Sequence, residues 1–458
     1  MRRIRLLIDF GSTFTKVVAV DLDKAEVLSR VQAASTVGED VTIGLRQALG
    51  KIEAEFPLSG KRGIEALACS SAAGGLRIVS VGVVPELTVE AATRAALGAG
   101  AKVVGCYSYE LTGAEVEEIG ETAPDIILLA GGTDGGDKRV IVHNARMLSR
   151  LDLDRIHLLV AGNKAAFDEI KAIFDTRWTN IRFTKNVMPE IGRLETEPCN
   201  REIRDLFIKN IIQAKGIGKA KNMVKGAIVP TPSAVLEAAR LLAEGYQEEK
   251  GLGDLIVVDV GGATVDVDSI ARGFPTRGEV AQTGLPEPYV KRTVEGDLGV
   301  RYNIDNLVEQ LKLKGFLPDT AFEESIAAIS AVGQLPQTEP QFFCDAMLAS
   351  VAVDVAMDRH AGTIQILYGP MGEMAVQRGK DLTEVKQVIG TGGPLVFSPD
   401  PRKILEKVLY QESTPHILKP KSPRFYLDTK YILYAAGLLV PSEPGAALAL
   451  MKRYLKEI

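Results

Sequence analysis

The stretch Ile8-Asp-Phe-Gly-Ser-Thr-Phe-Thr-Lys16 decides how this chain is expected to fold. An apolar strand ends in an acid, a short turn holds glycine and hydroxyl residues, and a second strand returns. Such a turn offers backbone N–H groups and hydroxyls to phosphate oxygens, while the carboxylate at the strand end can hold a hydrated magnesium ion. A polar hairpin without a ligand would give the same pattern, so this stretch alone leaves both interpretations open.

A second stretch, Val257-Val-Asp-Val-Gly-Gly-Ala-Thr-Val-Asp266, repeats the plan in the other half of the chain. Two such hairpins facing each other across a cleft would grip a phosphate chain from both sides. Asp9 and Asp259 are then expected to orient magnesium and its waters, and Asp266 to help orient the attacking water. Two twisted hairpins with no ligand are the alternative, which the repetition disfavours.

A third stretch, Val388-Ile-Gly-Thr-Gly-Gly-Pro-Leu395, places glycines after a strand, where a purine and ribose could lie against the backbone. Alone it resembles any loop, but its position after both hairpins favours a nucleoside site. The similar segment Leu128–Gly136 comes before the second hairpin and is interpreted as a strand-end turn. The sequence therefore predicts ATP and magnesium as ligands. Catalytic roles fall to Asp9, Asp259 and Asp266, magnesium to Asp9 and Asp259, and nucleotide contacts to Gly11, Ser12, Thr13, Thr15, Lys16, Gly261, Gly262, Ala263, Thr264, Gly390, Thr391, Gly392 and Gly393.

Composition narrows the classes of function. The chain has 458 residues, of which 46% are hydrophobic and 25% charged, and its net charge is only −5. No long block of Lys or Arg suggests nucleic acid or an anionic membrane surface, and no segment approaches the roughly 20 apolar residues of a membrane span. The four scattered cysteines predict reduced thiols in a cytoplasmic protein and no zinc site.

The order of elements predicts two lobes with an insertion. Strand–helix alternation between about residues 60 and 210 indicates an inserted α/β unit with a parallel sheet. A helix at Ser233–Glu244 and a polar linker at Gln247–Gly253 mark the boundary between lobes spanning residues 1–245 and 246–458. The remainder after the second hairpin reads as mainly helical.

The three stretches, together with the helix after Pro232 and a small-residue helix at Ala435-Ala436-Gly437, resemble the phosphate, adenosine and connecting motifs of the superfamily that holds actin, heat-shock chaperone ATPases and sugar kinases. The resemblance implies a two-lobed actin-like (ribonuclease H-like) α/β fold. Within that superfamily the whole chain resembles the MutL/GlmL family, accessory proteins of adenosylcobalamin-dependent glutamate mutase and related aminomutases. The matching segments are Ile8–Lys16, Leu128–Gly136, Val257–Asp266, Thr293–Gly299 and Ile389–Pro394.

The resemblance implies an ATP-dependent chaperone or reactivating factor for a cobalamin-dependent mutase, and it leaves a homo-oligomer open. One departure bears on mechanism: chaperone ATPases carry a Glu before the Pro-Thr of the first connecting helix, whereas Thr231 stands there in this chain. Glu237 and Glu295 are candidate substitute bases, although a solvated or structural acid is the favoured interpretation of each. A small-molecule kinase and a non-enzymatic actin-like scaffold remain the alternatives. The inserted unit also resembles the alternation of cobalamin-binding domains, but their Asp-x-His-x-x-Gly loop is absent.

Overall fold

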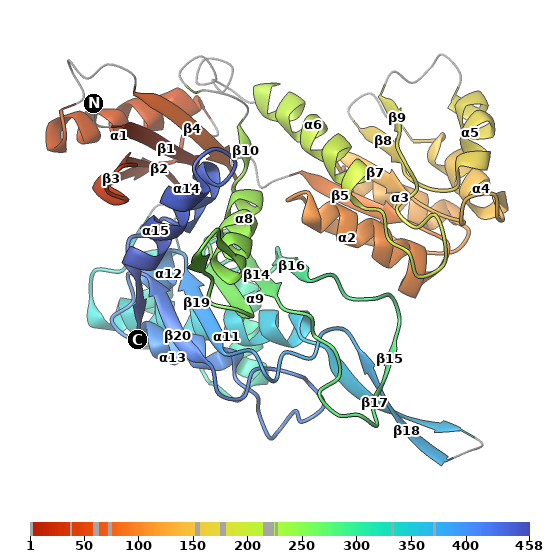
Figure 1. The fold of residues 1–458 in the computed structure, drawn as a ribbon. Coiled ribbons are helices and arrows are strands. Elements are labelled where there is room, and N and C mark those ends of the chain that lie inside the picture. The colour runs from red at the N-terminus through yellow and green to blue at the C-terminus, as the bar shows by residue number, and fades with distance from the viewer. Residues whose placement is uncertain are drawn as a thin grey trace. The chain divides into compact units, whose positions relative to one another are not determined.

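The computed structural model describes residues 3–36, 39–57, 64–71, 76–151, 156–174, 180–213, 224, 228–330, 334–369 and 372–458. The protein is α/β, and its chain forms two compact units (Figure 1). The first unit comprises Met1–Ala72, Ile212–Thr283 and Glu287–Ile458, and the second comprises Ala73–Ile211 with Gly284–Pro286. The second unit thus interrupts the first in the chain order.

The first sheet has the strand order β10-β4-β1-β2-β3. Neighbouring strands β1, β2 and β3 run antiparallel, whereas β4 lies parallel to β1 and β10 parallel to β4. Helix α1 begins at Asp40, whose side chain accepts a hydrogen bond from the Thr42 N–H, and it packs on β2 and β3. The elements are β1 (Ile4–Phe10), β2 (Phe14–Asp21), β3 (Glu26–Ala34), α1 (Val41–Glu55), β4 (Glu65–Ser70) and β10 (Val229–Pro230).

The second sheet repeats this plan with the order β16-β14-β13-β19-β20-β21. Strands β13, β14 and β16 are antiparallel neighbours, and β19 and β20 continue in parallel beside β13. The same arrangement of three antiparallel and two parallel strands occurs twice in one chain, which confirms the predicted actin-like α/β fold. The strands are β13 (Leu255–Val260), β14 (Val265–Ile270), β16 (Val290–Glu295), β19 (Gln387–Thr391), β20 (Arg424–Asp428) and β21 (Leu455–Glu457).

Helices α8 (Thr231–Glu244), α14 (Leu433–Leu439) and α15 (Pro444–Tyr454) share one apolar core with both sheets. Small residues let α8 and α14 approach closely: a Cβ atom added to Gly437 would lie 1.8 Å from the carbonyl oxygen of Ala234. Leu7 and Val18 join this core from the first sheet, and Val257 joins it from the second. The small-residue helices therefore link the two sheets.

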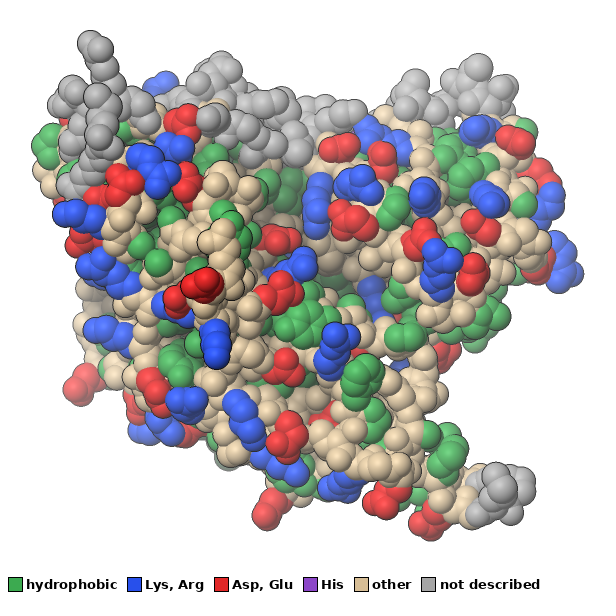
Figure 2. Space-filling model, viewed as in Figure 1, with side chains coloured by type: hydrophobic (Ala, Val, Ile, Leu, Met, Phe, Trp, Pro, Cys, Tyr) green, Lys and Arg blue, Asp and Glu red, His purple; other side chains and the backbone are tan. Residues whose placement is uncertain are grey.

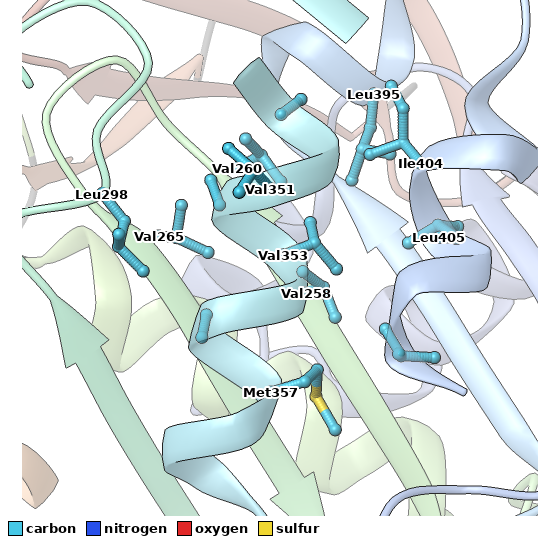
Figure 3. Close-up of a cluster of buried hydrophobic side chains, with 14 of the residues drawn as sticks. Val258, Val260, Val265, Leu298, Val351, Val353, Met357, Leu395, Ile404 and Leu405 are labelled. Carbon is cyan, nitrogen blue, oxygen red and sulfur yellow. The ribbon is translucent and has the colours of Figure 1, made fainter. Parts of the chain in front are cut away.

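A second core lies under helix α11 (Glu339–His360), which crosses the second sheet (Figure 3). Val351, Val353 and Met357 of α11 belong to the same buried cluster as Val258 and Val260 of β13 (Figure 3). By length and composition alone α11 would qualify as a membrane span, which the sequence had not suggested; core helices pass the same test. The other helices of this region are α9 (Ile304–Leu313), α10 (Thr320–Ile329), α12 (Gly393–Val396), α13 (Pro401–Leu405) and η5 (Glu406–Val408).

The inserted unit is a parallel sheet with the order β6-β5-β7-β8-β9. The segment after β7 is the strand-end turn that the sequence predicted, and Asn163 holds it by accepting from the Gly135 N–H and donating to the Gly136 carbonyl. Its elements are β5 (Arg77–Val81), η2 (Pro85–Val89), α2 (Glu90–Gly98), β6 (Lys102–Tyr107), α3 (Gly113–Thr122), β7 (Ile126–Leu129), α4 (Arg139–Leu148), β8 (His157–Val160), η3 (Lys164–Ala166), α5 (Phe167–Phe174), β9 (Ile181–Phe183) and α6 (Glu197–Gln213).

The structure differs from the sequence interpretation in three places. Strand β4, which the alternation had grouped with the insertion, belongs to the first sheet because it pairs with β1. The polar linker at Gln247–Gly253 includes part of a short hairpin, β11 (Gly245–Tyr246) with β12 (Glu249–Lys250). The region read as mainly helical also contains a separate sheet, ordered β15-β18-β17. Its strands are β15 (Ala281–Thr283), β17 (Thr363–Gly369) and β18 (Gly372–Arg378).

Candidate functional site

The two hairpin turns have the same local geometry. The Gly11 N–H donates to the Phe14 carbonyl at 3.1 Å, and the Gly261 N–H donates to the Thr264 carbonyl at 2.9 Å. A Cβ atom would lie only 2.5 Å from the Phe14 oxygen at Gly11 and 2.9 Å from the Thr264 oxygen at Gly261. Both turns are this tight because glycine leaves room for the closing carbonyl.

The turns also lie next to each other. A Cβ atom on Gly262 would be 3.1 Å from the Thr13 methyl carbon, so the first turn touches the second. Gly299 packs closely against the second turn, because a Cβ atom on Gly299 would lie 2.2 Å from the carbonyl carbon of Ala263. The structure therefore brings the two predicted phosphate-binding turns together, with the Thr293–Gly299 segment packed against one of them.

Asp9 is fully buried and its carboxylate is heavily engaged. One oxygen accepts from Lys16 Nζ at 2.7 Å, and the other accepts from Thr231 Oγ1 at 2.6 Å. The Cys69 thiol lies 3.6 Å from the latter oxygen. Asp9 and Lys16 face each other because they are register partners in the β1–β2 ladder.

Lys16 is enclosed by aromatic rings as well as by Asp9. Its Nζ lies 4.2 Å from the ring centroid of Tyr431 and 5.3 Å from that of Tyr434. Burial alone would lower the pKa of Lys16, but the Asp9 carboxylate and the two tyrosines raise it well above the ordinary value. A permanent positive charge therefore sits beside the first turn.

Asp259 occupies the equivalent place in the second sheet, but its register partner is Asp266 rather than a lysine. Within the described residues its carboxylate accepts no hydrogen bond and forms no ion pair. Burial, and then the neighbouring charge of Asp266, raise the pKa of Asp259 to about 7; Lys16 opposes this rise and Asp9 adds to it. Among the described residues, the site thus holds a desolvated carboxylate that no cation contacts directly.

Asp266 is better compensated. Its carboxylate accepts from Arg292 Nη2 at 2.6 Å and from Thr264 Oγ1 at 2.9 Å. Arg292 is itself buried and lies on β16, beside Asp268. The predicted catalytic carboxylates Asp9, Asp259 and Asp266 are therefore close enough to interact, but only Asp259 lacks a partner among the described residues.

The glycine-rich segment after β19 lies against the second hairpin. Gly392 has φ +96°, and a Cβ atom there would lie 2.8 Å from Oδ1 of Asp259, so only glycine fits between loop and carboxylate. Around Gly393 there is open space for a Cβ atom, whereas Gly390 packs on Leu405. Thr391 donates its hydroxyl to Asp428 at 3.0 Å.

Thr15 was expected to contact the nucleotide, but its hydroxyl faces helix α1. A Cβ atom added to Gly44 of that helix would lie 3.1 Å from the Thr15 hydroxyl oxygen. This places it on the helix side of β2, opposite to Lys16.

The motifs missed three residues that complete this region. Asp428 accepts the Ile432 and Leu433 N–H groups at 2.7 and 2.9 Å and so starts α14; burial raises its pKa. Arg30 lies 5.5 Å from the Tyr431 ring and 5.7 Å from the Phe397 ring, and two of its buried guanidinium nitrogens have no hydrogen-bond partner among the described residues. An acid ending an apolar strand, as at Asp9 and Asp259, was a signal for Asp428; Arg30 and Tyr431 carried none.

The candidate bases occupy different settings. Thr231 begins α8 and donates its hydroxyl to Asp9, so it stands at the site without supplying a carboxylate. Glu237 is on the exposed face of α8. Glu295 accepts from Arg359 at 2.6 Å, and burial raises its pKa. Glu295 is therefore paired with Arg359, as a structural acid would be, and Glu237 is exposed to solvent, as a surface acid would be.

A hydrated magnesium ion fits this donor set better than a directly ligated metal. Among the described residues, no group of three or more His, Cys, Asp or Glu side chains could enclose an ion. Magnesium usually keeps several waters and needs one or two carboxylates together with phosphate oxygens. Asp259 offers such a carboxylate, because it is desolvated and unpartnered within the described part of the chain.

The repeated sheets and their adjoining turns define an actin-like α/β protein. The sequence pattern describing the MutL protein family matches residues 5–455. Protein MutL of Clostridium tetanomorphum is 47% identical over 459 residues, covering 99% of each chain. The chain therefore belongs to the MutL protein family.

Several solved structures show distant similarity. A nucleotide-free acetone carboxylase is 14% identical with a TM-score of 0.41, covering 96% of this chain and 70% of its own. A ligand-bound xylulose kinase from Lactobacillus acidophilus is 10% identical with a TM-score of 0.36, covering 100% and 93%. At TM-scores this low, the similarity carries no functional conclusion.

Proposed function

We propose that this protein is an ATP-dependent, slowly hydrolysing chaperone or reactivating factor for an adenosylcobalamin-dependent mutase, either glutamate mutase or a related aminomutase. The nucleotide would lie between the two hairpin turns. Gly11, Ser12 and Thr13 would face its phosphates from one side, and Gly261, Gly262, Ala263 and Thr264 from the other. Lys16 would supply positive charge, and the Gly392–Gly393 loop would support the nucleoside.

The unpartnered carboxylate of Asp259 is the observation that carries the nucleotide part of the proposal. A half-buried, desolvated acid whose pKa is about 7 is costly to ionise unless a cation arrives. Hydrated magnesium brought in with the phosphates would supply that cation, and Asp9 would reach it across the adjoining turn. Asp266, which Arg292 holds in place, would help to orient the attacking water.

Slow hydrolysis follows from the start of α8. Thr231 stands where a base is expected, and its hydroxyl is committed to Asp9. A hydroxyl cannot take a proton from water as a carboxylate does, so positioning and charge stabilisation are left to act alone. Slow hydrolysis of ATP suits a conformational switch in which bound ATP draws the two lobes together.

The partner is inferred from family resemblance. A mutase stalled on damaged cofactor would need to visit an open state that is sparsely populated, and the ATP-bound form of this protein would bind that state preferentially. Such a role is expected of a cytoplasmic protein.

Thermal melting tests the nucleotide part. Because a ligand that binds only the folded state stabilises it by about 2.7 kcal/mol at 100 times its Kd, ATP with magnesium should raise the melting temperature. Asp259→Ala should abolish the rise, whereas Glu309→Gln, on the exposed face of α9, should keep it. An unchanged wild-type melting curve would refute nucleotide binding.

A reconstitution assay tests the partner part. The protein, ATP and fresh adenosylcobalamin are added to glutamate mutase that has been inactivated by cofactor damage, and turnover is followed. Recovery is expected only with ATP and should fail with Asp259→Ala. Recovery without ATP would contradict the proposed coupling, and no recovery with the cognate mutase would remove the reactivating role.

A further inference from the structure

The β17–β18 hairpin carries an unusual concentration of exposed apolar side chains. The exposed fractions are 55% for Ile366, 47% for Leu367, 78% for Tyr368 and 50% for Met374. Figure 2 shows hydrophobic side chains over this hairpin beside the grey atoms of its tip. Apolar surface of this kind, gathered on one projecting element, marks an interaction site.

Among the residues that the structure describes, the outer half of the hairpin has two strands. Strand β15 pairs with Val376–Arg378 at its base, whereas the described ladder from Ile366 to Gly369 pairs with Gly372–Ala375 alone. A two-stranded hairpin is marginally stable in water, and here both of its faces are exposed. Further strands would stabilise it.

Within the described part of the chain, the edge of β17 beyond its bridge from Thr363 to Ile417 has no strand beside it and is suited to accept one. The Ile364 N–H donates outward to the His416 carbonyl at 2.8 Å, so alternation along the strand also turns the backbone groups of Ile366 and Tyr368 outward. From Thr363 to Gly369 the strand has neither a charge nor a proline. Proteins commonly use charges or prolines to block such edges, and this one has neither.

We propose that β17 pairs antiparallel with β17 of a second copy of this chain, about a two-fold axis at Leu367. Each Ile366 then exchanges hydrogen bonds with Tyr368 of the other copy, which satisfies the outward backbone groups of both residues. Leu367 faces Leu367 of the second copy. The two three-stranded sheets become one continuous sheet across the dimer.

Self-pairing fits the side chains on both faces. Leu367 lies opposite Met374 in the β17–β18 register, so one face gathers two copies of this apolar pair. On the other face Ile366 lies beside Tyr368 of the second copy. The hairpin's charges, Glu373 and Arg378, are on β18, one strand away from the new contact, so no like charges meet across it.

The test measures the mass of the full chain by sedimentation velocity and light scattering over a range of concentrations. We expect a species of twice 49.3 kDa. Leu367→Lys places like charges opposite each other across the axis and should weaken the dimer at least tenfold, as should Leu367→Glu. Leu317→Lys changes a side chain that is 84% exposed elsewhere and should leave the mass unchanged.

Mixing the two charged variants gives the decisive result. Leu367→Lys and Leu367→Glu should each be monomeric alone and should form a mixed dimer together, because only self-pairing brings position 367 opposite itself. Ile366→Pro should also give monomers while keeping the wild-type circular dichroism spectrum, since it removes an outward N–H at an edge.

The proposal would be overturned if the wild-type protein stays monomeric when its concentration is raised 100-fold above the lowest concentration measured. A dimer that survives both charged variants would also overturn it, as would a mutase subunit captured by this edge in place of a second copy. The ATP-dependent rise in melting temperature should persist in the monomeric variants, so failure here is distinguishable from failure of the proposed nucleotide function.

Discussion

Replacing Asp259 with Asn should stabilise the protein without its ligand at pH 8 and have much less effect at pH 5. Burial and Asp266 raise the pKa of Asp259 from 3.8 to about 7, so the folded state binds a proton more tightly than the unfolded chain does. The free energy of unfolding therefore falls as the pH rises from about 4 to about 7, and above pH 7 the full cost of the buried charge is present. Asp259→Asn removes a charge while keeping the side-chain shape.

The magnitude follows from the same values. The pKa rises by about 3, and each pH unit corresponds to 1.36 kcal/mol, which gives an upper bound of about 4 kcal/mol. Water entering the site and relaxation around it should reduce this to roughly 2 kcal/mol. Asn also retains the close approach to Gly392.

Urea unfolding at pH 5 and pH 8, with EDTA present, measures this difference for the wild type and the variant. Glu309→Gln is the matched control, because it removes a carboxylate on the exposed face of α9 and should shift both curves equally. If the stability difference between the wild type and Asp259→Asn is the same at both pH values, the carboxylate is not held in the desolvated state inferred here.

Two further substitutions test the packing and the charge pair. Gly437→Ala should destabilise the fold by roughly 3 kcal/mol or more, because its Cβ atom would lie 1.8 Å from the Ala234 oxygen; Gly50→Ala, on an open part of α1, should stabilise it by about 0.5–1 kcal/mol. Equal melting temperatures for the two variants would refute the close α8–α14 contact. Lys16→Met should cost about 3–5 kcal/mol by leaving Asp9 buried and unpaired, and adding Asp9→Asn should recover part of that loss in urea unfolding. A double variant no more stable than the single one would contradict the pair.

Local sequence patterns predicted much of the fold. Apolar strands that end in an acid, with glycine in the following turn, predicted both hairpins. The sheet of β15, β17 and β18 was missed, and although β17 and β18 are consecutive, β15 joins them from a distant part of the chain. Pairing of that kind depends on partners that no short window contains.

The candidate site divides in the same way. The residue types at Asp9, Asp259 and the glycine turns follow from short-range chemistry, since a tight turn needs glycine and a phosphate needs donors. The partners of those residues depend on the folded chain. Thr231 is 222 positions from Asp9, and Tyr431 reaches Lys16 because α14, which follows it, packs on the first sheet. The charge state of Asp259 likewise depends on which groups surround it after burial, because desolvation and neighbouring charges arise from packing and are absent from the linear order of residues.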